Sequence, residues 1–294
     1  MTEALTPAEP LVSIVLPTLN GARYIAASIA SCLAQSYRHF ELLVVDGGSS
    51  DGTLRIVESI GDRRLRIVRQ THNADRLPGA LNLGFAHARG DLFTWTQDDD
   101  LFAPEALAVL IDGLRRHPSA GLVYGGTAFI DEDGVVVRTA PLEPPEALAR
   151  TNSVGHSFLY RRSVASAVGP YDPAFLMAED AHYWMRVYRR FPMVRLDGTL
   201  CFHRLHPGSL TCRGYGAYES LRVCARSRRV VLGINRAEYW RQLSAAHVEE
   251  AFAAYQRRDY WHVWPSLARA ALRHPRPLLQ DGVLSIAARS VIHS

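Results

Sequence analysis

The stretch Leu92-Phe93-Thr94-Trp95-Thr96-Gln97-Asp98-Asp99-Asp100 carries the strongest structural signal in this chain of 294 residues. Its apolar, β-rich half predicts a buried strand, and three consecutive carboxylates follow the carboxyl end of that strand. Ligands bind at this edge in open α/β sheets. Adjacent carboxylates repel one another unless a cation or several hydrogen-bond donors compensate them, and Mg²⁺ or Mn²⁺ suits such oxygen ligands. On this segment alone, two interpretations stay open: a metal site, or a solvated acidic loop that leads into a helix near Pro104.

Strand and helix patterns alternate on the amino-terminal side of this stretch. The spacing of apolar residues predicts strands at 11–16, 41–45, 65–68 and 92–96, and helices at 22–35, 53–60 and 78–88. Such alternation is typical of right-handed βαβ units, so we expect an α/β fold with a mostly parallel sheet. Beyond the acidic triplet the patterns predict, in order, a helix at 104–117, a hairpin at 122–130 and 135–138, a strand at 158–161, an amphipathic helix at 180–191 and a strand at 194–202.

Composition narrows the class of protein. Hydrophobic residues make up 48% and charged residues 21%, as in ordinary globular proteins. No apolar run reaches the roughly 20 residues that cross a bilayer, and residues 1–10 lack the pattern of a secretory signal. The four cysteines show no metal-binding spacing, so we expect reduced thiols and a cytoplasmic protein. All 33 basic residues are arginine, which excludes chemistry that depends on lysine.

The carboxyl-terminal part differs in charge from the rest. Residues 215–294 carry 12 arginines against 6 acidic residues, and their pattern is helical, with breaks expected at Gly233, Pro265 and Pro275. We therefore expect two domains, a catalytic one at 1–214 and a basic helical extension at 215–294. The extension either contacts anionic lipid as a peripheral surface or carries solvated arginines only. Nucleic-acid binding is not expected, because no basic stripe with interleaved aromatic residues is present.

Three strand ends supply polar loops. These are Pro17-Thr18-Leu19-Asn20, Asp46 with its Gly/Ser turn at 47–50, and Gln97-Asp98-Asp99-Asp100. If the strands are neighbours, the loops meet at one edge of the sheet. Asp46 can accept a hydrogen bond from a base or a ribose hydroxyl, and the turn that follows offers backbone N–H groups.

With these loops in place, the sequence resembles the family 2 glycosyltransferases, which have a GT-A fold. The resemblance extends over about residues 11–212 and rests on Val12–Asn20, Val44–Thr53, Ala80–Gly84, Ala88–Asp91, the acidic triplet with Pro104, Gly169–Asp172, Ala178–Asp180 and Arg204–His206.

The resemblance implies a nucleotide site made by Pro17, Thr18, Asn20, Asp46 and Asp75, with Arg76 and Asn82 near the same pocket. Residues 97–99 stand where the family carries its metal-binding DxD motif, but Gln97 replaces the first acid and Gly47 replaces an acid often seen after Asp46. We therefore take Asp99 as the main metal ligand and place Asp98 at the nucleotide.

The resemblance also assigns roles in the second half of the chain. Asp180 falls at the position of the family's catalytic base, with Glu179 as the alternative. Without the resemblance, Asp180 would be read as a helix cap. His206 is a candidate metal ligand or diphosphate contact, although a loop histidine is often structural. Arg204 is expected to pair with the diphosphate, because a guanidinium matches such oxygens well.

The function implied is that of a metal-dependent inverting glycosyltransferase of the hexosyltransferase type. It would use Mg²⁺ or Mn²⁺ to move a sugar from a nucleotide-sugar donor, with UDP- or dTDP-sugars favoured, to a hydroxyl of a glycan or lipid-linked acceptor. The setting would be cell-surface polysaccharide biosynthesis, in the cytoplasm or at the inner face of the cell membrane. Two alternatives stay open: a non-catalytic nucleotide-sugar-binding partner, prompted by Gln97, and a sugar-1-phosphate nucleotidyltransferase, which would be expected to have a Gly-rich basic loop after the first strand.

Overall fold

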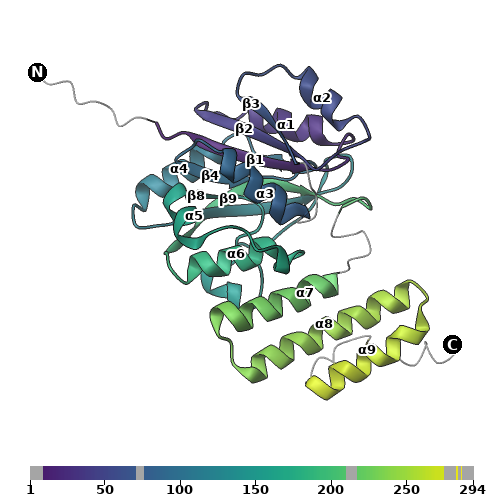
Figure 1. Ribbon diagram of the computed structural model, residues 1–294. Coiled ribbons are helices and arrows are strands. Elements are labelled where there is room, and N and C mark those ends of the chain that lie inside the picture. The colour runs from purple at the N-terminus through teal and green to yellow at the C-terminus, as the bar shows by residue number, and fades with distance from the viewer. Residues whose placement is uncertain (1–8, 71–75, 210–216, 275–282, 284–285, 287–294) are drawn as a thin grey trace, which may run out of the picture. The chain divides into compact units, whose positions relative to one another are not determined.

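The computed structural model describes residues 9–70, 76–209 and 217–274, together with Val283 and Ile286. Figure 1 shows a central sheet with flanking helices, followed by consecutive helices in the carboxyl-terminal part. The chain divides into two compact units. The first unit comprises residues 1–173 and 186–205, and the second comprises residues 174–185 and 206–294.

The sheet belongs to the first unit and has nine strands among the described residues, in the order β3-β2-β1-β4-β8-β6-β9-β5, with β7 paired to β6. The strands are β1 (Val12–Thr18), β2 (Phe40–Asp46), β3 (Leu65–Arg69), β4 (Leu92–Trp95), β5 (Leu101–Phe102), β6 (Leu122–Ile130), β7 (Val136–Thr139), β8 (Phe158–Arg161) and β9 (Met193–Arg204). Strands β1 to β4 run parallel, whereas β8 lies antiparallel to both β4 and β6. The predicted α/β fold is therefore confirmed, with a parallel half and a mixed half.

The predicted helices lie close to their predicted positions, whereas the helix at Arg162–Val168 was not predicted. They are α1 (Ile25–Leu33), α2 (Thr53–Ser59), α3 (Arg76–His87), α4 (Ala106–Arg116), α5 (Arg162–Val168), α6 (Glu179–Tyr188), α7 (Ala217–Ser227), α8 (Arg236–Gln256) and α9 (Tyr260–Arg273), with 3₁₀ turns at Pro145–Ala149 and Pro173–Phe175 and a π-helical turn at Arg228–Leu232. Strand β5 has two residues and escaped prediction, because so short a segment shows no periodicity.

Apolar side chains cover both faces of the parallel strands. Val12, Ile14 and Leu16 of β1 alternate onto one face, where they join a core with α1, α2 and α4. Helix α3 packs on the other face, where Gly84 lies against Val15 and Val45. Strands β1, β2 and β4 are thus buried along their whole length, which is why their sequences are mainly apolar, whereas β3 at the edge is only partly buried.

The second unit contains a separate core between α8 and α9. Val248, Ala251 and Ala254 of α8 pack with Val263 and Leu267 of α9. In the part of the chain that the structure describes, no helix is both long enough and apolar enough to cross a membrane.

Of the three helix breaks expected in the second unit, the one at Pro275 lies outside the described residues, and the other two had different outcomes. Gly233 has a φ of 68° and ends the π-helical turn, as predicted. The break expected at Pro265 was wrong, because α9 continues through it. Pro265 is exposed and lies in the second turn of the helix, so its ring displaces one backbone hydrogen bond near the helix start without interrupting the buried face.

Candidate functional site

The three polar loops predicted from the sequence lie together at the carboxyl edge of the parallel strands. Strand β1 lies between β2 and β4, with Thr18 opposite Asp46 and Val15 opposite Trp95. The Thr18 hydroxyl donates to Asp98 Oδ2 at 2.5 Å, which joins the first loop to the acidic loop. The sheet order thus brings residues 80 positions apart into hydrogen-bond distance.

The first two loops are also tied to each other. The backbone N–H of Ser50 donates to Asn20 Oδ1 at 2.8 Å, and the N–H of Asn20 donates to the Ser49 hydroxyl at 2.9 Å. Asp46 is buried, and its carboxylate accepts the N–H groups of Gly48 and Ser49, both at 3.1 Å. These contacts pre-form a polar rim at the strand ends.

The remaining nucleotide candidates occupy varied positions. Pro17 is buried within β1, and Arg76 begins α3 with a φ of 47°. Asn82 pairs with the backbone of Tyr171 through both amide atoms, each at 2.8 Å, and so holds the 170–172 segment against α3. Asp75 lies outside the described residues. The nucleotide-binding roles of these residues remain predictions.

The three acidic residues of the triplet are all largely buried, but their neighbours differ. Burial first, and then the charges of Asp99 and Asp100, raises the pKa of Asp98 to about 6, although the Thr18 hydroxyl opposes this shift. Asp99 and Asp100 are both buried, with 7% and 1% of their surface exposed. Three carboxylates this close need compensating charge or hydrogen-bond donors.

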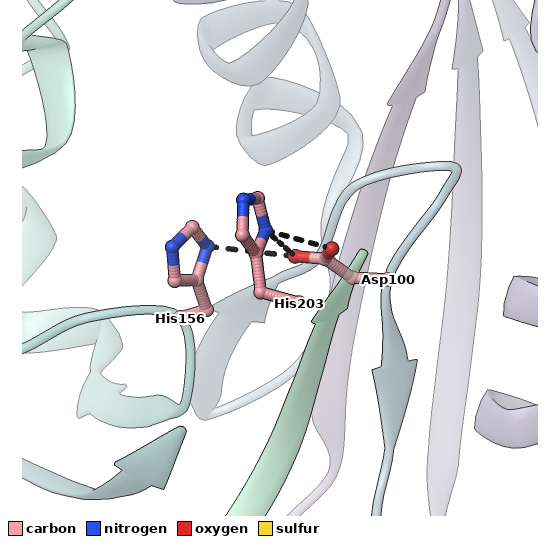
Figure 2. Close-up of side chains that lie close together, drawn as sticks. All are labelled: Asp100, His156 and His203. Carbon is pink, nitrogen blue, oxygen red and sulfur yellow. Dashed lines mark hydrogen bonds and ion pairs between the residues drawn. The ribbon is translucent and has the colours of Figure 1, made fainter. Parts of the chain in front are cut away.

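Asp100 receives that compensation from two histidines (Figure 2). Its carboxylate lies 2.9 Å from Nδ1 of His203 on β9 and 3.4 Å from Nδ1 of His156 in the loop before β8. The two imidazole rings stack with centroids 4.1 Å apart. Burial would raise the pKa of Asp100, but the two histidines outweigh burial and hold it well below its usual range.

The same cluster is the group of side chains in the described residues that can hold a metal ion. One ligand atom from each of Asp100, His156 and His203 lies within 4.8 Å of the others. Burial lowers the pKa of His203, but the neighbouring Asp100 carboxylate reverses the shift and raises it. Sequence reasoning missed this set, because its members are 56 and 47 positions apart and only the pairing of β5 and β9 places two of them side by side.

The predicted ligands Asp99 and His206 have other surroundings. Asp99 neighbours the cluster in sequence, and His206 lies in the loop after β9, where the second unit begins. Their assignment as metal ligands remains a prediction.

Arg204 joins the acidic loop to the β6–β7 hairpin. Its Nε donates to the carbonyl of Asp99 at 3.1 Å, and its Nη1 donates to the carbonyls of Asp131 and Glu132 at 3.0 and 2.9 Å. The side chain is buried, and its guanidinium lies over the Tyr24 ring. Arg204 therefore positions the acidic loop against the hairpin, whereas its contact with a diphosphate remains a prediction.

The two base candidates open helix α6. Glu179 is buried, whereas Asp180 is half-buried and accepts the N–H of Ala181 through Oδ1 at 2.6 Å. Burial, followed by the charge of Asp180, raises the pKa of Glu179 to about 8. Glu179 is therefore neutral near pH 7.

The sequence of this chain matches a known protein family. The family model described as glycosyl transferase family 2 matches residues 13–169, which include the three loops and the acidic triplet. The chain belongs to family 2 of the glycosyltransferases. The match covers more than half of the chain.

Relatives of this family 2 chain come from several bacteria. It is 34% identical over 161 residues to the putative glycosyltransferase EpsE of Bacillus subtilis, a match that covers 53% of this chain and 58% of EpsE. It is 30% identical over 195 residues to a PGL/p-HBAD biosynthesis glycosyltransferase of Mycobacterium bovis, covering 62% and 71% of the two chains. An uncharacterized glycosyltransferase of Rickettsia conorii is 29% identical over 212 residues, where the match covers 67% of this chain but only 34% of that protein.

Solved structures show the same fold. Staphylococcus aureus TarS in complex with UDP-GlcNAc superposes with a TM-score of 0.66 at 18% identity, covering 96% of this chain and 88% of that one. A mannosyltransferase of Pyrobaculum calidifontis in complex with GDP-Man and Mn²⁺ gives a TM-score of 0.61 at 19% identity, covering 97% and 81%. The family 2 chain therefore has the GT-A fold that its sequence predicted.

Proposed function

We propose that this family 2 chain transfers a sugar from a nucleotide-sugar donor, UDP- or dTDP-linked in our expectation, to a hydroxyl of a glycan or lipid-linked acceptor. The observation that carries the proposal is the meeting of three polar loops at one sheet edge, within the segment that matches the family. Open α/β sheets bind their ligands at that edge. The M. bovis relative is named as a PGL/p-HBAD biosynthesis glycosyltransferase, which supports a biosynthetic role, and we place this chain in cell-surface polysaccharide assembly.

The chemistry proposed is a direct displacement that inverts the anomeric carbon. One carboxylate must take the proton of the acceptor hydroxyl as that oxygen attacks. Asp180 fits this task better than Glu179, because the buried Glu179 keeps its proton near pH 7 and cannot accept another. The amino-terminal turn of α6 also favours an anion at Asp180.

A divalent metal ion fits the residues at the sheet edge. Asp100, His156 and His203 offer one oxygen and two nitrogen ligands, a mixed set that suits Mn²⁺ better than Mg²⁺, which prefers oxygen ligands alone. The ion would supply positive charge to the diphosphate leaving group. The Mn²⁺ bound to the P. calidifontis mannosyltransferase supports this choice. Asp99 and His206 remain the sequence-based candidates for further ligands.

The partners follow from the same proposal. The acceptor would be presented at the inner face of the cell membrane, and the basic helices of the second unit would contact anionic lipid there. The family match argues against a sugar-1-phosphate nucleotidyltransferase.

A donor-hydrolysis screen tests the proposal. The purified chain is incubated with UDP-, dTDP- and GDP-sugars, with Mn²⁺, Mg²⁺ or neither, and release of the nucleoside diphosphate is measured. We expect slow, metal-dependent release from one donor, with loss of that release in Asp100→Asn. Exposed His262, which pairs with Asp259, provides a matched control, and His262→Gln should behave as wild type.

The variant Asp180→Asn tests whether Asp180 acts as the catalytic base or contributes to donor binding. Hydrolysis by water need not use the acceptor base, so this variant should retain donor binding and lose transfer once an acceptor is supplied. Donor binding without any release or transfer would favour the non-catalytic nucleotide-sugar-binding partner. Absence of binding to every donor would refute the proposal.

A further inference from the structure

Helix α9 is apolar on two opposite sides. Val263 and Leu267 face the core that α9 shares with α8. On the other side, Trp261, Trp264 and Leu272 are 80%, 48% and 87% exposed. A helix with one apolar face buries that face against a neighbouring element, as α9 does against α8. The second apolar face of α9 is therefore not explained by the packing of this unit.

The exposed residues form one continuous stripe. At 3.6 residues per turn, a single side of α9 carries the following exposed residues: Trp261, Trp264, Pro265, Ala268, Ala271 and Leu272. We call this set the α9 stripe. Nothing charged interrupts it, and two of its six members are tryptophans. Large exposed apolar patches of this kind mark interaction sites.

Positive charge borders the stripe. Arg269 and Arg273 lie on the same flank of α9, and exposed Arg257 and Arg258 come directly before the helix. Residues 217–274 hold ten arginines and five acidic residues. Of the acidic residues in this range, Asp259 contacts His262 and Glu250 lies 3.5 Å from Arg269.

We propose that the α9 stripe inserts into the headgroup region of an anionic lipid bilayer, with the flanking arginines on the lipid phosphates. Tryptophan prefers the membrane interface, where its ring is apolar and its N–H can still find a partner. A helix that lies in the interface buries an apolar face and places basic residues at the anionic surface. The inference rests on the proposed function, which requires a membrane-bound acceptor, and it names the surface that reaches the membrane.

The test is flotation of the full chain with two kinds of vesicle, phosphatidylcholine alone and a mixture with phosphatidylglycerol. The variant Trp261→Gln/Trp264→Gln/Leu272→Gln removes the stripe. The matched control is Val136→Gln/Val137→Gln, which changes two valines of β7 that are 52% exposed in the first unit. We expect the wild type and the control to float with anionic vesicles, and the stripe variant to partition at least tenfold more weakly.

A second readout locates the inserted residues. Lipids brominated along their acyl chains should quench the tryptophan emission of the wild type much more than that of the stripe variant. The tryptophans left in the variant are Trp95 and Trp184, which are buried, and Trp240, which is partly buried. Equal flotation of the stripe variant and wild type would overturn the proposal, as would equal binding to both kinds of vesicle. Self-association of the wild type that the variant loses, without vesicle binding, would also overturn it and make the stripe an interface between copies.

Donor hydrolysis without vesicles, measured on the same preparations, keeps the two proposals apart. Normal hydrolysis by the stripe variant, together with lost flotation, supports the membrane surface. Normal hydrolysis with no flotation of the wild type refutes the surface and leaves the glycosyl-transfer proposal standing. Flotation without binding of any donor refutes glycosyl transfer while the surface stands.

Discussion

At the scale of single residues, Gly21 controls the position of Asp98. A side chain at residue 21 would meet Asp98 Oδ2 and would lie 2.7 Å from Thr18 Oγ1, so it would displace the hydrogen bond between the first loop and the acidic loop. We expect Gly21→Ala to weaken donor binding by at least tenfold. Isothermal titration with the donor that the hydrolysis screen identifies measures this. Unchanged affinity would show that this hydrogen bond does not shape the nucleotide site.

Glu179 sets a pH dependence of stability. Because its pKa is about 8 in the folded chain and lies near 4.5 when unfolded, the unfolded state loses its proton first as the pH rises. The free energy of unfolding therefore falls between about pH 4.5 and 8 through this residue and levels off above that range. Glu179→Gln should remove this fall and raise the stability at pH 8 by on the order of a few kcal/mol.

Urea unfolding at pH 4 and pH 8 measures this effect, and the gain should shrink toward zero at pH 4. A gain of the same size at both pH values would mean that packing, and not the titration of Glu179, is responsible.

At the scale of elements, Gly84 allows α3 to approach the sheet. A Cβ there would press on Val15 Cγ1 and would lie 3.0 Å from Val45 Cγ2. Gly84→Ala gains about 1 kcal/mol of helix propensity but overpacks a tight contact, which costs about 1–3 kcal/mol. Overpacking should prevail, so chemical denaturation should show net destabilisation. Exposed Ala86 on the same helix is the control, and Ala86→Ser should change stability by no more than about 0.5 kcal/mol.

Arg204 links β9 to two loops through its guanidinium N–H groups. We expect these hydrogen bonds to contribute more to the position of the loops than the positive charge does. Lysine in its place would keep the charge but lose the simultaneous bonds to the carbonyls of Asp99, Asp131 and Glu132. We expect Arg204→Lys to lower the melting temperature and to weaken Mn²⁺ binding, as measured by thermal scanning and electron paramagnetic resonance. A variant with normal stability and metal binding but weak donor binding would instead favour the predicted diphosphate contact.

At the scale of the whole molecule, metal binding should appear as stability. A ligand that binds only the folded chain stabilises it by about 2.7 kcal/mol at 100 times its Kd. Mn²⁺ should therefore raise the melting temperature of the wild type and of the control His262→Gln. It should fail to do so in His203→Gln, because the cluster loses a ligand. A shift that persists in His203→Gln but disappears in Asp99→Asn would transfer the metal site to the ligand predicted from the sequence.

The sequence by itself determined the parallel half of the fold and the family. Apolar runs and period-3.6 patterns are local, so the strands that become β1 to β4, the helices between them and the polar loops at their ends could be placed by residue number.

Only the tertiary structure decided which side chains meet. Asp100 and His203 are 103 positions apart and become neighbours because β5 pairs with β9, and no local pattern records such a pairing. The tertiary structure likewise brings three backbone carbonyls to the guanidinium of Arg204. It also leaves two tryptophans of α9 exposed, because burial depends on which elements pack on each face of a helix. Local periodicity follows from the chain's own geometry, whereas a site depends on contacts across the sheet that form only once the strands are ordered.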